Sequence, residues 1–81
     1  MERRPAHPLR IWRASYSITM KALAAEMGVS QSYLSEVERG IKRPAFKNMM
    51  SIRAATRYDV TADEMMDWWA DNIEPNLGTT K

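Results

Sequence analysis

The chain contains no cysteine, which excludes a disulfide framework, a thiolate zinc site and a cysteine nucleophile. A reducing, cytoplasmic location fits this absence. No apolar run approaches the roughly 18 residues that cross a membrane, and the N-terminus lacks the apolar core of a signal peptide. The sequence therefore predicts a cytosolic protein with no membrane partner.

Histidine and glycine are scarce as well. The single histidine, His7, lies in a proline-containing segment without apolar periodicity, so residues 1–8 are expected to form a flexible basic arm. The sequence has no glycine-rich phosphate loop, no carboxylate pair in a scaffolded cleft and no credible set of metal ligands. We therefore expect neither an enzyme nor a metal site, and no cofactor.

The charges that are present are divided unevenly along the chain. Residues 1–57 hold eleven Lys and Arg against four acids, a net charge of +7, whereas residues 58–81 hold six acids against Lys81, a net charge of −5. A basic body suggests a polyanionic partner, and the acidic end would face away from it. With 81 residues, there is room for one small domain.

Apolar residues recur at helical spacing, and strand alternation is absent from the sequence. The pattern predicts an all-α fold of five short helices, at about residues 8–16, 20–27, 31–39, 44 onwards and 62–72. Hydroxyl side chains stand at three helix starts, where they can act as caps: Thr19, Ser30 and Thr61. The domain is expected to span residues 9–73, followed by a disordered tail at 74–81.

Residues 20–39 contain the most informative pattern. Ala24 is the small residue that two steeply crossing helices need where their backbones approach, and Gly28 supplies the turn between them. Apolar residues occupy the other positions of the wedge between the helices: Leu23, Met27, Val29, Leu34 and Val37. Seven matched positions within twenty residues predict a helix-turn-helix.

This unit resembles the Cro/repressor-type helix-turn-helix proteins, the XRE family of transcriptional regulators. The resemblance covers about Leu9 to Met66 and is clearest over residues 28–40, Gly-Val-Ser-Gln-Ser-Tyr-Leu-Ser-Glu-Val-Glu-Arg-Gly, followed by Arg-Pro-Ala-Phe at 43–46. It implies a phage-repressor-like domain whose helix at 31–39 lies in the major groove of double-stranded DNA. It also implies a partly buried ion pair between Arg13 and Glu38 that fixes this helix.

Helical geometry selects the residues of helix 31–39 that would contact DNA bases. Since Leu34 and Val37 face the core, the opposite face would meet the base edges. Apart from Arg39, the residues on that face are Gln31, Ser32, Ser35 and Glu36. Three roles are open to Tyr33: contact with a phosphate, contact with a thymine methyl, or cover for the helix flank. The competing interpretation of the whole face is an ordinary solvated helix surface.

Cations around this helix are the expected contacts to the DNA backbone. They are Lys21, Arg39, Lys42, Arg43 and Lys47, with Arg3 and Arg4 of the arm, for which solvated surface charge is the alternative. The family usually has glutamine where this chain has Met20, so Lys21 or backbone N–H groups would make the contact there. Residues 57–59, Arg-Tyr-Asp, also depart from the family, since they replace its usual Leu-Gly turn.

The last predicted helix carries four large side chains that we expect to form a homodimer surface: Met65, Met66, Trp68 and Trp69. Neighbouring indoles on a helix diverge by about 100°, so one would pack within the domain. The other would meet a partner, or alternatively pack over the same domain. A homodimer would bind an inverted repeat. By resemblance, we expect an autoregulatory repressor of a phage or mobile element in the bacterial cytoplasm or nucleoid.

Two other roles are compatible with the fold. An antitoxin would repress its operon and also bind a toxin, but it would need a long apolar or disordered extension, and residues 74–81 are short for that. A helical protein-interaction module that does not bind DNA would have no need for the net positive charge of residues 1–57. Under either alternative the chain would bind a protein partner, which the sequence does not identify.

Overall fold

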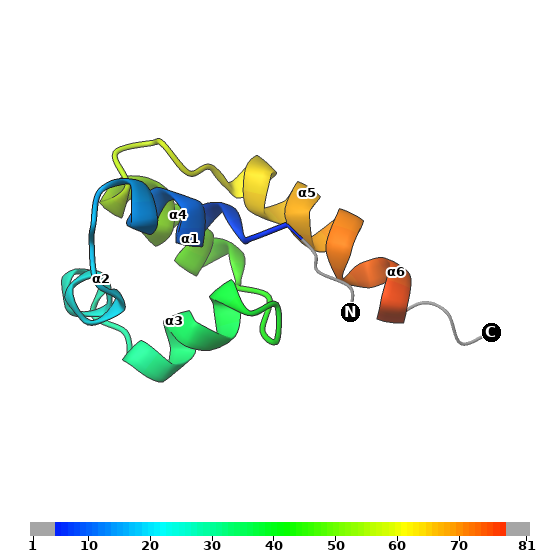
Figure 1. Cartoon of the computed structure of the whole chain (residues 1–81), viewed down its shortest axis with the longest axis horizontal. Helices are drawn as coiled ribbons and strands as arrows, with labels where there is room; N and C mark the ends of the chain where they lie inside the picture. The colour runs from blue at the N-terminus through cyan, green and yellow to red at the C-terminus, as the bar shows by residue number, and fades with distance from the viewer. Residues whose placement is uncertain (1–4, 78–81) are drawn as a thin grey trace.

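The computed structural model describes residues 5–77, and this part of the chain is all α-helical (Figure 1). Its helices are α1 (Pro8–Ser15), α2 (Met20–Met27), α3 (Gln31–Glu38), α4 (Phe46–Ala55), α5 (Ala62–Asn72) and α6 (Glu74–Leu77). The predicted fold class is confirmed. The structure differs in adding α6, a short helix at the start of the segment predicted as a disordered tail, and in beginning α4 after Pro44.

Local capping explains where the central helices begin. The Thr19 hydroxyl accepts a hydrogen bond from the backbone N–H of Ala22 (3.1 Å), and Ser30 accepts one from Tyr33 (3.0 Å). At α5, Thr61 and Glu64 form a reciprocal capping box. These side chains satisfy N–H groups that have no partner within the helix, so each fixes a helix start close to its predicted position.

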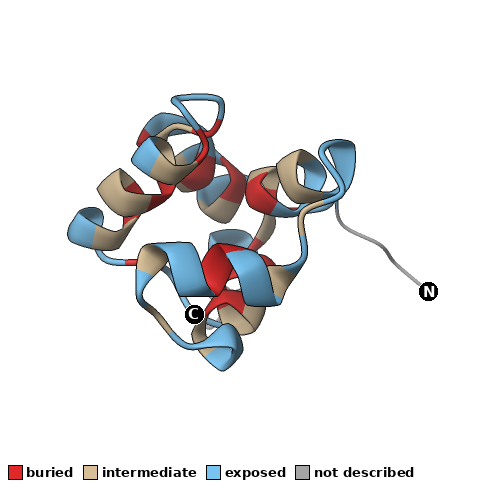
Figure 2. Ribbon diagram, turned by 90° about the vertical axis from the view of Figure 1, so that its left-hand side faces the viewer, coloured by how far each residue is buried: buried red, intermediate tan, exposed pale blue. Residues whose placement is uncertain are grey.

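The helices enclose one core. α2 packs against α3 and α4, α4 against α5, and α1 against α5. The buried residues at its centre are Leu9, Leu23, Ala24, Leu34, Met49, Ile52, Val60, Ala62 and Met65. Buried and exposed positions alternate along the helices, as expected for amphipathic helices around a shared centre (Figure 2). None of the helices formed by residues 5–77 has the length and apolar character needed to cross a bilayer.

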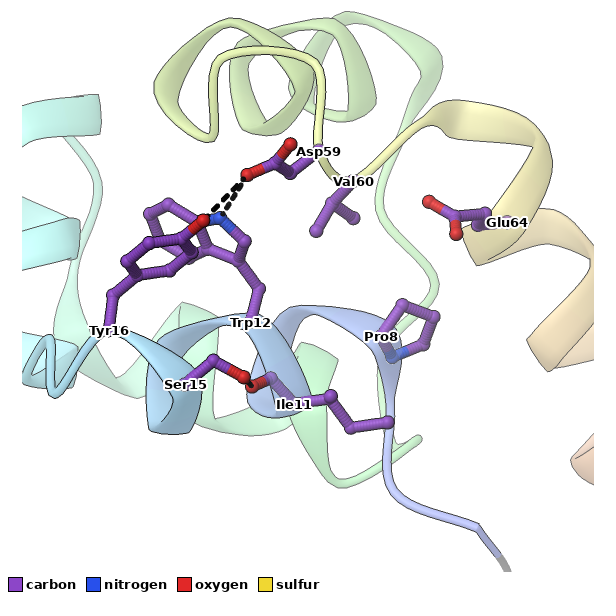
Figure 3. A pocket seen from close by; sticks show the side chains of 8 residues that line it. All are labelled: Pro8, Ile11, Trp12, Ser15, Tyr16, Asp59, Val60 and Glu64. Atoms are coloured by element: carbon purple, nitrogen blue, oxygen red, sulfur yellow. Dashed lines mark hydrogen bonds between the residues drawn. The ribbon is translucent and has the colours of Figure 1, made fainter.

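The α4–α5 loop is held against α1. Arg57 and Tyr58 both adopt left-handed backbone conformations, with φ of 55° and 70°. The Asp59 carboxylate then accepts hydrogen bonds from the Trp12 indole (3.0 Å) and the Tyr16 hydroxyl (3.5 Å), as Figure 3 shows. This contact sets the path of the chain into α5. Although residues 57–59 differ from the usual turn of the family, α5 therefore still packs against the core.

The N-terminal segment differs from the predicted flexible arm, because residues 5–8 pack against the domain. The Pro5 carbonyl accepts a hydrogen bond from the Trp68 indole (2.9 Å), and His7 is only 2% exposed. The imidazole caps α1 by accepting a hydrogen bond from Leu9 N–H at Nδ1 (3.0 Å), and its ring meets that of Trp68 edge-on, with centroids 4.8 Å apart. Burial lowers the pKa of His7 to about 4, and the negative charge of Glu38 opposes this shift only in part.

Candidate nucleic-acid interface

Helices α2 and α3 form the predicted helix-turn-helix unit. Gly28 ends α2 with a φ of 74°, a left-handed conformation that glycine adopts without steric cost. The Val29 N–H then bonds the Ala24 carbonyl (3.0 Å), which closes the turn. Leu34 and Val37 are fully buried on the inner face of α3. The opposite face of α3 is thereby turned outward.

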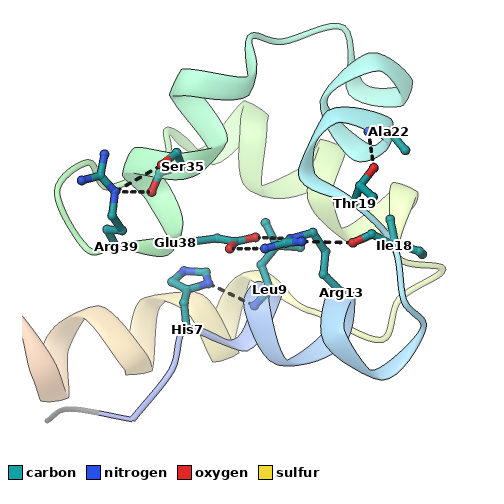
Figure 4. A network of polar contacts seen from close by, with 9 residues as sticks. All are labelled: His7, Leu9, Arg13, Ile18, Thr19, Ala22, Ser35, Glu38 and Arg39. Atoms are coloured by element: carbon teal, nitrogen blue, oxygen red, sulfur yellow. Dashed lines mark hydrogen bonds and ion pairs between the residues drawn. The ribbon is translucent and has the colours of Figure 1, made fainter.

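A bidentate ion pair fixes α3 to α1 (Figure 4). Arg13 donates from Nε to Glu38 Oε2 (2.7 Å) and from Nη2 to Oε1 (2.8 Å). A third donor, Nη1, bonds the Ile18 carbonyl at 3.0 Å. The side chains are 18% and 4% exposed, so Glu38 is almost withdrawn from water. Hydrogen bonding to this carboxylate raises the pKa of Arg13 above its usual value.

The outward face of α3 carries the residues predicted to contact bases, but the structure separates them into two groups. Gln31 and Ser32 are exposed at the first turn. Ser35 is half-buried and accepts hydrogen bonds from Arg39 Nε at both its hydroxyl (3.2 Å) and its carbonyl (3.3 Å). Glu36 is half-buried, with Oε1 4.0 Å from the Lys42 ammonium. The first turn of α3 therefore offers the most accessible polar groups.

Tyr33 lies at the edge of this face and contacts α4. Its hydroxyl accepts a hydrogen bond from Asn48 Nδ2 (2.8 Å), and the Lys42 ammonium lies 5.8 Å from the ring centroid. Asn48 was not among the predicted site residues. It stands 15 residues away on another helix, and no local pattern in the sequence pairs it with Tyr33.

The predicted phosphate-contacting cations within residues 5–77 are all exposed: Lys21, Arg39, Lys42, Arg43 and Lys47. Lys42 and Arg43 lie in the α3–α4 loop, directly after the helix-turn-helix. Arg43 Nη1 is 4.0 Å from Glu74 Oε2, a loose pair between two half-exposed side chains. Such pairs are weak in water, so both cations remain available to an anion. Arg3 and Arg4 lie outside the described residues.

The structure divides the predicted dimer residues between core and surface. Met65 is 2% exposed and Trp68 is 8% exposed, so both belong to the domain's own interior. Met66 and Trp69 are half-buried and keep accessible area. Trp68 is thus the indole that packs within the domain, whereas Met65, also expected at the dimer surface, belongs to the core and could meet a partner only if the core opened.

A helix-turn-helix family model matches residues 9–62, two thirds of the chain. The chain belongs to the helix-turn-helix family. This confirms the XRE-type resemblance predicted from the recognition unit.

Two relatives are described as uncharacterized HTH-type transcriptional regulators of Mycobacterium tuberculosis, from strains CDC 1551 / Oshkosh and H37Rv. Each is 39% identical to this chain over 49 residues, which is 60% of this chain and 35% of the relative. The matched segment thus spans about a third of the length of these relatives. No solved structure shows significant similarity to this chain.

Proposed function

We propose that this helix-turn-helix protein binds double-stranded DNA sequence-specifically and regulates transcription. One observation carries the proposal: α3 presents an exposed polar first turn while the bidentate Arg13–Glu38 pair holds it rigidly against α1. Specific base contacts require side chains held in a defined geometry, because a mobile helix would lose entropy on binding. The family membership and the names of the relatives agree with this function.

In this proposal, α3 lies in the major groove and its first turn contacts the bases. Gln31 makes a bidentate contact with an adenine edge, and Ser32 contacts a neighbouring base. Glu36 accepts from a cytosine amino group once Lys42 turns toward a phosphate. Ser35 has a lesser role, because its hydroxyl already holds Arg39. The exposed cations next to α3 contact the DNA backbone on either side of the groove.

We further propose that the protein acts as a homodimeric, autoregulatory repressor. One α3 contacts only a few base pairs, whereas two copies about 34 Å apart would bind an inverted repeat. Of the residues predicted for the dimer contact, Met66 and Trp69 keep accessible surface on α5. A bound dimer would repress by occupying the promoter of its own gene.

The test is selection of duplexes from a random-sequence pool, followed by fluorescence anisotropy with the selected duplex and a scrambled duplex over a salt series. We expect an inverted repeat, a preference of at least ~10³ over the scrambled duplex, and a steep fall of affinity with salt. Equal, weak binding to both duplexes would overturn sequence-specific recognition. Binding of the protein to a duplex from upstream of its own gene, measured in the same way, then tests autoregulation.

A further inference from the structure

Tyr33 and Asn48 join α3 to α4 through a hydrogen bond whose direction matters. Asn48 Nδ2 donates and the Tyr33 hydroxyl oxygen accepts, at 2.8 Å. A phenolic hydroxyl has one proton to donate in addition to its acceptor lone pairs. Within residues 5–77 this proton is donated to no other group. The contact with Asn48 therefore leaves the Tyr33 O–H as a donor of fixed position.

The surroundings of Tyr33 favour an anion as the acceptor. The Lys42 ammonium lies 5.8 Å from the ring centroid, and Lys47, directly before Asn48, is exposed. A cation and a hydroxyl donor thus lie together where the α3–α4 loop meets α3 and α4, and the exposed Lys47 is on the same turn of α4 as Asn48. Among residues 5–77, the one carboxylate within 4.0 Å of the Lys42 ammonium is that of Glu36, and the pair is exposed enough for water to screen it.

The position of Tyr33 on α3 selects which anion it meets. Tyr33 lies at the side of the outward face, one helical turn before Glu36. The hydrogen bond from Asn48 holds its hydroxyl toward α4, away from the residues of the first turn that would contact bases. A helix in the major groove has the bases in front of it and the phosphates of the two strands at its flanks. A flank donor next to a cation therefore meets a phosphate oxygen.

Resting on the proposed DNA-binding function, we propose that Tyr33 donates a hydrogen bond to a DNA phosphate, and that Asn48 is the residue that positions it. This choice settles on one of the three roles open to Tyr33 from the sequence. It assigns Asn48, which does not contact DNA itself, an effect on affinity that acts only through the tyrosine hydroxyl.

Tyr33→Phe tests the donor directly, because it keeps the ring under Lys42 and removes only the O–H. We expect affinity to fall about tenfold or more, since hydrogen bonds to charged groups are the stronger ones. The loss should be equal on selected and scrambled duplexes, and the salt slope should stay unchanged because a neutral donor displaces no counterion. Lys42→Ala should instead lower that slope by about one. Tyr58→Phe, at an exposed tyrosine of the α4–α5 loop, is the matched control.

Asn48→Ala tests the positioning role. We expect a loss of a few-fold in the wild-type background and no further loss in the Tyr33→Phe background, with melting curves recorded for all variants. Equal losses in both backgrounds would show that Asn48 acts independently of the hydroxyl and would overturn its role. An unchanged affinity in Tyr33→Phe, or a loss confined to the selected duplex, would overturn the phosphate contact. Failure of the wild type to prefer the selected duplex would instead overturn the proposed function.

Discussion

Glu38 shows how a single carboxylate can hold a functional helix. Its side chain is 4% exposed and both of its oxygens accept from Arg13, so its charge is balanced by one residue of another helix. Breaking a buried pair leaves the remaining charge without compensation, which costs more than the pair itself contributes. The pair therefore couples stability to the placement of α3.

Replacing Glu38 by alanine should lower the free energy of unfolding by about 3 kcal/mol and abolish specific DNA binding together. Urea denaturation and anisotropy on the same samples measure both effects. Glu36→Ala is the control for stability alone, because Glu36 lies 4.0 Å from Lys42 in a solvent-accessible pair and its loss should change stability by less than about 1 kcal/mol. Full stability of the Glu38 variant would contradict the role of the pair.

His7 makes stability depend on pH in the mildly acidic range. The folded protein holds the imidazole neutral, with a pKa of about 4, whereas the unfolded chain takes up a proton near the ordinary value of 6.5. Protons therefore bind preferentially to the unfolded state, so the contribution of His7 is complete above pH 6.5 and is lost as pH falls toward 4. The loss should reach at most about 3 kcal/mol.

His7→Asn provides the comparison, because asparagine can still cap α1 through its side-chain oxygen but does not titrate. Between pH 6.5 and 5, the wild type should lose stability and the variant should lose much less. Chemical denaturation at half-unit pH steps measures this difference. Parallel pH profiles would contradict the assignment of the effect to His7.

Sequence reasoning succeeded at residues whose roles are local and missed those whose partners are distant. Thr19 and Ser30 were predicted as caps because each bonds a residue only three positions away. The Arg13–Glu38 pair was expected only through resemblance. The burial of His7 depends on Trp68 of α5, and the proline-containing segment around it gave no periodic signal.

At the scale of elements, α3 separates a structural face from a face for recognition. The inner face is fully buried, so substitutions there would change stability as well as binding. The outer first turn is exposed and makes no contribution to the core. This separation allows specificity to be changed without unfolding the domain.

Gln31→Ala should therefore leave the melting temperature unchanged and relax base preference at one position per half-site by about 1–3 kcal/mol. Binding titrations with every single-base variant of the selected duplex measure the change. Lys21→Ala should instead weaken binding uniformly across these duplexes and lower the salt slope by about one. A uniform loss in the Gln31 variant would reassign that residue to the DNA backbone.

The element least accessible to prediction was the α4–α5 connection. Arg57 and Tyr58 adopt left-handed conformations although neither is a glycine, so the sequence does not indicate this turn. The Asp59 carboxylate holds the loop by accepting a hydrogen bond from the Trp12 indole of α1. Helix positions followed from caps and periodicity, but the docking of α5 depended on this long-range contact. The same limit explains why Met65 was expected at a dimer surface and why the sequence did not show which of Trp68 and Trp69 packs within the domain: periodicity alone does not show which face of a helix meets the core.

At the scale of the whole molecule, the proposed dimer depends on the surface that α5 leaves uncovered. Trp69→Ser should weaken self-association at least about tenfold, because large aromatic side chains dominate the energetics of interfaces. Sedimentation equilibrium over a concentration series measures the dimer Kd. The free energy of unfolding of the monomer should change little in this variant. In contrast, Trp68→Ala should lower it by about 3–5 kcal/mol through loss of core packing. Unaltered association of the Trp69 variant would exclude this surface.

The contact between Pro5 and Trp68 also has a consequence for the order of folding events. These residues are 63 positions apart, so their hydrogen bond closes almost the whole chain into one loop. Closing long loops costs more entropy than forming neighbouring helices such as α2 and α3, and such contacts form late. Contacts absent from the folding transition state act mainly on the unfolding rate. Substitutions that detach the N-terminal segment from α5 should thus speed unfolding and leave the folding rate nearly unchanged.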